Sequence, residues 1–254
     1  WLKNAEIHIH TALLVFGKTR EAALAGLEKA TKELHISLFA SNQLVANASK
    51  TSFFVVRTPR EKVDTNYMLQ VGQSTIIESE SINLLGVTIT RNLSWDTHVR
   101  NVVSSLRSNN GLISRITTYV PNKMVTPLVH GLIMSKIRYC LPLFCDVRQS
   151  PSDPISSSMH DLQVQLNNAM RTVSGVKLED RVEVSDLLLQ VGIPSVNQLA
   201  AETTLGCNNR ISLTKMQMIE LLTHQKFFSH YVNMYIALAV HSASAVYTAR
   251  RDNK

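Results

Sequence analysis

The sequence predicts an α+β protein in which a small antiparallel sheet with a packed helix precedes an α-helical bundle. Two observations predict this class. Before residue 90, short runs of β-branched and apolar residues alternate with turn residues, which is typical of strands. After residue 95, apolar residues recur at helical spacing without a strong strand signal. The predicted boundary between the two parts therefore lies near residue 90.

The first predicted elements are a strand and a helix. Residues 11–16, TALLVF, have the composition of a buried strand, and Gly17 ends it. Thr19 is a suitable cap for a helix that continues to about residue 42. Its core face is predicted from apolar residues at helical spacing, which are Leu24, Leu27, Leu34, Leu38 and Phe39. We expect this helix to pack on the strand before it.

The remaining strands follow a turn at residues 47–51, NASKT, whose Asn and Ser side chains bind local backbone. A strand is predicted at 52–57, and Pro59 interrupts it. Residues 67–71 and 74–77 form a predicted hairpin. Together with the next strand they complete a small antiparallel sheet.

Residues 81–98, SINLLGVTITRNLSWDTH, predict a strand, a turn and a helix start in close succession. The strand covers 84–89, and Gly86 within it indicates a bulge or the close approach of another backbone. Residues 92–94 form the turn, and Ser94 is the predicted cap of a helix that begins at Trp95.

The helical part contains several segments separated by Pro and Gly. The helix from residue 95 has an apolar stripe and ends at Pro121, and a second runs over 123–139. Further helices are predicted over 154–173 and 183–190. The tail from about residue 196 to 251 is helical by composition, with a break near 207–210.

Positive charge is concentrated in one block. The chain carries a net charge of +7, and residues 91–149 contain 8 Lys or Arg against 2 Asp or Glu. In the first predicted helix of this block, Arg100, Arg107 and Arg115 lie within about 80° of one another on a helical wheel. This pattern is compatible with a face that follows a phosphate backbone and also with an ordinary solvated helix surface.

Other composition signals exclude several classes of protein. Cys140, Cys145 and Cys207 form no disulfide framework, which is typical of an intracellular protein, nuclear or cytoplasmic. The spacing of Cys140 and Cys145, without a nearby His, predicts no metal site. The apolar run at 232–240 is too short for a bilayer, so no membrane partner is expected. Because the chain starts without an initiator methionine, we expect a fragment.

Four segments resemble the reverse transcriptases of non-LTR retrotransposons. They are TALLVFGKTREAA at 11–23, NQLVANASKTSFFVV at 42–56, LLGVTITRNLSWDTHV at 84–99 and LVHGLIMSKIRYCLPLF at 128–144. Their order matches the end of the palm, the primer-grip hairpin and the thumb of that family, over roughly residues 11–200. The resemblance implies a partial palm over 1–90, a helical thumb-like domain over 91–200 and a helical C-terminal extension over 201–254.

The resemblance also implies a nucleic-acid site. Lys50 matches the lysine of the family's SKT turn, which lies near the phosphates of the incoming nucleotide. Leu85, Gly86 and Val87 match the primer grip, and the basic helix after them would face template–primer backbone through Arg100, Arg107 and Arg115. The implied partner is a template–primer duplex. Trp95 and His98 match the thumb entry, where we expect a core anchor and a structural histidine.

The sequence departs from the family at the catalytic tetrad. The family has Tyr-x-Asp-Asp directly before the strand at 11–16, whereas this chain has Ile7, His8, Ile9 and His10. The family uses Mg²⁺, which requires hard oxygen ligands, so we expect no catalytic residue, no metal and no cofactor here. This chain alone is expected to be an inactive relative of RNA-directed DNA polymerases. The alternative is a non-catalytic helical module that binds nucleic acid or another protein.

Overall fold

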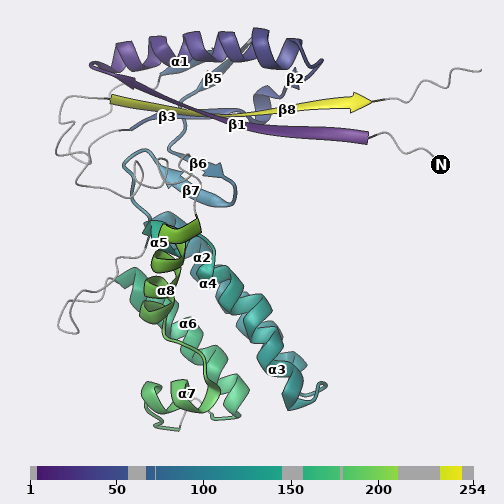
Figure 1. Ribbon diagram of the computed structural model, residues 1–254, viewed down its shortest axis with the longest axis vertical. Helices are drawn as coiled ribbons and strands as arrows, with labels where there is room; N and C mark the ends of the chain where they lie inside the picture. The colour runs from purple at the N-terminus through teal and green to yellow at the C-terminus, as the bar shows by residue number, and fades with distance from the viewer. Residues whose placement is uncertain are drawn as a thin grey trace, which may run out of the picture. The chain divides into compact units, whose positions relative to one another are not determined.

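The computed structural model describes residues 5–56, 67–71, 73–144, 157–177, 180–210 and 235–247 (Figure 1). The chain divides into two compact units: unit 1 comprises Trp1–Ser94 with Lys226–Lys254, and unit 2 comprises Trp95–Gln225. Unit 1 contains small antiparallel sheets and a long helix, and the elements described in unit 2 are helical. The predicted α+β class is therefore confirmed.

Unit 1 is built on a four-stranded antiparallel sheet. Its strands are β1 (Ala5–Gly17), β8 (Tyr235–Tyr247), β2 (Val45–Ala46) and β3 (Ser52–Val55). The order is β1-β8-β2, and β3 also pairs with β8. Helix α1 (Arg20–Leu34) packs along this sheet (Figure 1), and η1 (His35–Ala40) continues it as a π-helix. The predicted cap is confirmed, since Thr19 Oγ1 accepts a hydrogen bond from the backbone N–H of Ala22 at 3.1 Å.

Close packing joins α1 to the sheet. Ala23 and Leu27 of α1 are fully buried and share a cluster with Phe53, Val55, Leu69 and Val71, against which Leu13 and Val15 also pack. A Cβ atom added to Gly26 would lie 2.8 Å from Val15 Cγ1. The helix can therefore approach β1 only because residue 26 has no side chain.

Two further hairpins complete unit 1. Strands β4 (Met68–Val71) and β5 (Ser74–Ile77) pair as predicted, with Val71 opposite Ser74. The buried carboxylate of Glu78 accepts the backbone N–H of Val55 at 3.0 Å and that of Tyr67 at 3.4 Å. This side chain thus connects β3 with the start of the β4–β5 hairpin.

The prediction of one strand over 84–89 is wrong. The segment is a second hairpin, made of β6 (Ser81–Leu84) and β7 (Val87–Thr90), in which Leu84 lies opposite Val87. Leu85 and Gly86 form its two-residue turn with φ values of 50° and 83°. Positive φ at both positions is the type I′ geometry that suits the twist of a hairpin, so Gly86 serves a turn and not a bulge.

Unit 2 contains the helices α2 (Asp96–Ile116), α3 (Asn122–Val129), α4 (Ser135–Arg138), α5 (Leu141–Phe144), α6 (Ser157–Ser174), α7 (Val184–Val191) and α8 (Val196–Arg210), with the π-helix η3 (His130–Met134) between α3 and α4. These ranges confirm the four predicted helices to within a few residues. One difference is local: Trp95, and not Ser94, occupies the N-cap position of α2.

The helices of unit 2 share one hydrophobic core. Leu106 of α2, Ile133 of η3, Leu162 and Leu166 of α6 and Leu199 of α8 are all fully buried in it. Trp95 packs against its edge, as expected of a core anchor. The apolar stripe predicted for α2 therefore faces the core of unit 2, as its helical spacing indicated.

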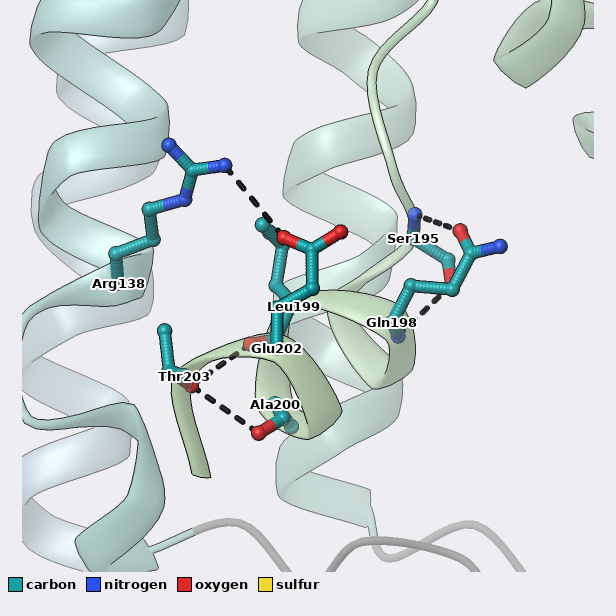
Figure 2. A network of polar contacts seen from close by, with 7 residues as sticks. All are labelled: Arg138, Ser195, Gln198, Leu199, Ala200, Glu202 and Thr203. Carbon is teal, nitrogen blue, oxygen red and sulfur yellow. Dashed lines mark hydrogen bonds and ion pairs between the residues drawn. The ribbon is translucent and has the colours of Figure 1, made fainter. Parts of the chain in front are cut away.

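Helix α8 begins with a capping box that Figure 2 shows. Ser195 Oγ accepts the backbone N–H of Gln198 at 3.2 Å, and Gln198 Oε1 accepts the backbone N–H of Ser195 at 2.8 Å. These reciprocal bonds satisfy donors that a helix start leaves without partners. The helix continues through residues 207–210, where a break was predicted.

The prediction of a helical tail is wrong for residues 235–247, which form β8. The prediction for 211–234 lies outside the described residues. Alanine and leucine favour a helix in isolation, but strand β8 pairs with three strands of unit 1, namely β1, β2 and β3. Tertiary pairing therefore outweighs local propensity in this segment.

Candidate nucleic-acid interface

Helix α2 separates its buried and exposed residues into two sides. Val99, Val103, Leu106 and Ile113 are buried in the core of unit 2. Two hydrogen bonds add to this packing: Asn109 Nδ2 donates to the carbonyl of Leu132 at 2.7 Å, and Asn110 Nδ2 donates to that of Gln165 at 2.9 Å. These contacts fix which side of α2 faces away from the core.

The exposed side carries Arg100, Arg107 and Arg115, here called the arginine row. A rise of about 1.5 Å per residue spaces them along the helix axis by roughly 10 and 12 Å. Most exposed residues between and beside them are small, namely Ser104, Ser108, Gly111 and Ser114, and Asn101 and Leu112 are exposed as well. A Cβ atom added to Gly111 would meet nothing within 4 Å. The arginine row therefore lies on an exposed side of α2 with mainly small residues around it, which a broad, charged partner can approach.

Few acidic residues lie near the row in the sequence. Asp96 is the only acidic residue between positions 95 and 144 of the sequence. Arg100 bonds within the first turns of its own helix, with Nε donating to the carbonyl of Asp96 at 3.3 Å and Nη2 donating to Thr97 Oγ1 at 3.2 Å. Within the described ranges, none of the ion pairs involves Arg107 or Arg115. Both side chains are exposed.

One further basic residue lies beside α2. Lys136 of α4 donates a hydrogen bond to Ser105 Oγ of α2, although the two residues are 31 positions apart. Lys136 is exposed, and on a helical wheel Ser105 lies well away from the arginine row, so the ammonium group adds positive charge to a flank of α2 and not to the row itself. Sequence reasoning counted Lys136 in the basic block but gave no reason to place it against α2.

Other members of the basic block have acidic neighbours. Arg91 of unit 1 lies 3.4 Å from Glu80 across the β6–β7 hairpin. Figure 2 shows Arg138 of α4 directed at Glu202 of α8, with a distance of 3.9 Å between nitrogen and oxygen. Since both pairs reduce the local excess of positive charge, the arginine row remains a more favourable part of the block for an anion than these two residues.

The residues predicted for the primer grip lie in unit 1. Leu85 and Gly86 form the exposed turn of the β6–β7 hairpin, where 70% of the Leu85 surface is accessible. Val87 is buried and starts β7. The turn thus presents one large apolar side chain and a glycine backbone to solvent, whereas Val87 has a packing role.

Lys50 is exposed at the end of η2 (Ala48–Lys50), also in unit 1. Asn47 Oδ1 accepts hydrogen bonds from the backbone N–H and the hydroxyl of Ser49, at 3.1 and 2.7 Å. The hydroxyl of Thr51 donates to the carbonyl of Asn47 at 2.9 Å. The predicted turn is therefore confirmed, and its polar side chains hold the backbone while Lys50 extends from it.

His98 is buried at the start of α2. Its ring contacts Phe144 of α5 edge to face, with centroids 5.0 Å apart. Burial lowers the pKa of His98 from its usual value of 6.5, because the charged imidazolium is poorly solvated there. The side chain is neutral near pH 7 and belongs to the core of unit 2, as the sequence predicted.

The described residues include no group of three or more His, Cys, Asp or Glu side chains that could hold a metal ion. In the same ranges, none of the helices combines the length and the apolar character needed to cross a bilayer. Residues 7–10 lie within β1 and pair with residues 242–245.

Comparison of the chain with protein-family models, with curated proteins and with solved structures finds no match.

Proposed function

We propose that this chain is the palm and thumb part of a reverse transcriptase of the non-LTR retrotransposon type, and that it binds the phosphate backbone of a template–primer duplex without catalysing polymerisation. The observation that carries the proposal is the arginine row: three exposed guanidinium groups on one side of α2, separated by small residues and without a carboxylate among them. The four sequence segments that resemble the family are the reason for proposing a template–primer duplex as the nucleic acid that is bound.

The chemistry of the row fits phosphate better than bases. A guanidinium group presents several N–H donors in a plane and binds phosphate oxygens through two of them. Three such groups over roughly 22 Å of helix follow a backbone and do not converge on one small ligand. We therefore expect binding with little sequence preference and a strong dependence on salt.

In this proposal the β6–β7 turn approaches the primer end. Gly86 has no side chain and adopts φ of 83°, so the backbone at the turn is accessible to a ligand. Leu85 would make apolar contact with a sugar or base. Lys50 would contribute a single positive charge near phosphate.

The proposal includes no chemical step. Phosphoryl transfer by this family requires magnesium held by carboxylates, and positions 7–10 are Ile, His, Ile and His. Added Mg²⁺ and deoxynucleotides should produce no primer extension by the chain alone.

The test is a salt titration of binding to a fluorescent RNA–DNA primer–template duplex, followed by anisotropy. The test variant is Arg100→Gln/Arg107→Gln/Arg115→Gln, in which glutamine removes the charge but remains polar and has a similar helix propensity. The matched control, Lys18→Gln/Lys29→Gln/Lys32→Gln, removes the same charge from unit 1 around α1.

We expect the arginine variant to lose about tenfold or more in affinity at 0.1 M salt, with the slope of log K against log salt reduced by about 2 to 3. The control should retain nearly all of its affinity. Equal losses in both variants would show that only net charge matters. Absence of binding by the unmodified chain would reject the proposal.

A further inference from the structure

The middle strand of the main sheet in unit 1 comes from the far end of the chain. All 13 residues of β8 pair with β1, and on its other edge β8 pairs with β2 and β3. Among the described strands, β1 has pairing only with β8. Without β8, β1 and β3 would each lose this hydrogen-bonded neighbour, and no strand would connect them in a sheet.

The register places two alanines of β8, Ala237 and Ala239, between strands β1 and β3. Ala239 lies opposite Leu13 on β1 and opposite Phe53 on β3. Ala237 lies in the same way between Val15 and Val55. Directly opposed residues in an antiparallel sheet occupy the same face, so positions 237 and 239 lie on the face that carries these four side chains.

That face is the one covered by α1. Leu13, Val15, Phe53 and Val55 all belong to the cluster that contains Ala23 and Leu27 of the helix. The approach is close, because a Cβ atom on Gly26 of α1 would lie 2.8 Å from Cγ1 of Val15, the residue opposite Ala237. Space between α1 and the sheet is limited, which explains why small residues at 237 and 239 suit this register.

The connection between β8 and the rest of unit 1 is indirect. The chain leaves unit 1 after Ser94, forms the helices of unit 2 and returns to unit 1 in its last part. No short loop or hairpin turn places β8 beside β1 or β3. Its position therefore depends on backbone hydrogen bonds and on the fit under α1.

We propose that the space between β1 and β3 is a strand-binding site, and that residues 235–247 occupy it as an internal ligand. The site takes an extended segment that runs antiparallel to both neighbours and has small residues at the two positions under α1. A separate peptide of this chemistry binds the same site when the internal strand is weakened. This mode of recognition uses main-chain hydrogen bonds for affinity and the helix-covered face for selectivity.

The experiment uses the full chain with Ala239→Pro, because proline in a central strand removes a hydrogen-bond donor and weakens the internal ligand. A fluorescent peptide of residues 233–249 is titrated with this variant and with the unmodified chain, and anisotropy is recorded. We expect saturable binding to the variant and at least tenfold weaker binding to the unmodified chain, whose site is occupied.

Peptide variants define the selectivity. A peptide with Ala237→Leu/Ala239→Leu should bind at least tenfold more weakly, whereas Leu238→Ile, a change of shape at similar volume on the other face, should bind like the parent. A scrambled peptide of the same composition should not bind. Equal binding of the parent and scrambled peptides, or no binding to the Ala239→Pro chain, would overturn the proposal if that chain is folded.

A second measurement remains decisive if the proline variant does not fold. In the full chain with Cys140, Cys145 and Cys207 changed to serine, the pair Leu13→Cys/Ala239→Cys is oxidised and compared with Leu13→Cys/Leu238→Cys. We expect a rapid disulfide within single chains for the first pair and little for the second, because successive residues face opposite sides of a strand. Equal yields for both pairs, or a disulfide formed only between chains, would reject β8 as the internal ligand.

Discussion

The helices of unit 2 bury one continuous hydrophobic core, whereas the buried residues of unit 1 lie in smaller clusters around separate sheets. In unit 2 the core side chains come from elements that follow one another over Trp95–Ala200. In unit 1 the largest cluster combines β1, α1, β3 and the β4–β5 hairpin, and the sheet beneath it needs β8 from the end of the chain. Unit 2 thus buries its apolar side chains between segments that are close in sequence, whereas unit 1 depends on a segment that is distant in sequence.

Because of this difference, we expect different mutations to destabilise the two units. Contacts that are close in sequence require little loop closure, so helices such as those of unit 2 can assemble from neighbouring segments. Unit 1 cannot complete its sheet until the whole chain is available. We therefore expect unit 1 to respond to changes at its C-terminal strand and unit 2 to changes in its helices.

The largest expected effect comes from removing a core side chain in each unit. Phe53→Ala should lower the free energy of unfolding by about 3–5 kcal/mol and Leu166→Ala by about 2–5 kcal/mol, because each leaves a cavity around a fully buried position. Hydrogen exchange read by mass spectrometry should show faster exchange in β1, α1 and β8 for Phe53→Ala, and in the helices of unit 2 for Leu166→Ala. Uniform acceleration through both units in either variant would contradict the comparison.

A medium effect is expected at the connection between α6 and α7. The guanidinium of Arg171 donates to the carbonyls of Lys177 at 2.9 Å and Asp180 at 3.1 Å. Arg171→Ala leaves these carbonyls without that donor and should cost about 1–3 kcal/mol. The control Arg181→Ala changes an exposed arginine in the same connection and should cost less than about 0.5 kcal/mol. Chemical denaturation of both variants measures the difference, and equal stabilities would remove this role from Arg171.

The smallest expected effect is on the pH dependence of stability, which can be measured separately in the two units. Burial lowers the pKa of His98 in unit 2 and of His35 in unit 1 from 6.5, so the unfolded chain binds protons more readily than the folded chain. The stability contributed by the neutral histidines is complete above about pH 6.5 and is lost as the pH falls below that value. His98→Phe should flatten the pH dependence of hydrogen exchange in unit 2 between pH 7.5 and 5, and His35→Phe should do so in unit 1. An unchanged slope in unit 2 for His98→Phe would show that this histidine does not titrate with unfolding.

Several elements could be predicted because their signals are local. Thr19 before an amphipathic segment predicts the start of α1, and Gly192 after residues 184–191 ends α7 with φ of 68°. The β4–β5 hairpin follows from two short apolar runs around a two-residue turn. The β6–β7 hairpin was missed because Leu85 occupies a turn position where φ is 50°, which apolar residues rarely adopt.

Only part of the candidate site could be predicted, because some of its contacts depend on how the helices pack. The spacing of Arg100, Arg107 and Arg115 depends on helix geometry alone, so the sequence was enough to place them on one side of α2. The bond between Lys136 and Ser105 depends on how two helices pack, and the pairing of Arg138 with Glu202 depends on where α8 lies. Helix periodicity contains no information about either neighbour.

The α+β class, the helices of unit 2, the arginine row on one side of α2 and the absence of carboxylates at positions 7–10 could all be predicted without coordinates. These features follow from residue types and from periodicity within one segment. Only the tertiary structure decided that residues 235–247 form a strand and that this strand lies between β1 and β3. Alanine and leucine in this segment favour a helix in isolation, but hydrogen bonding along both strand edges and the limited space under α1 outweigh that preference and select a strand.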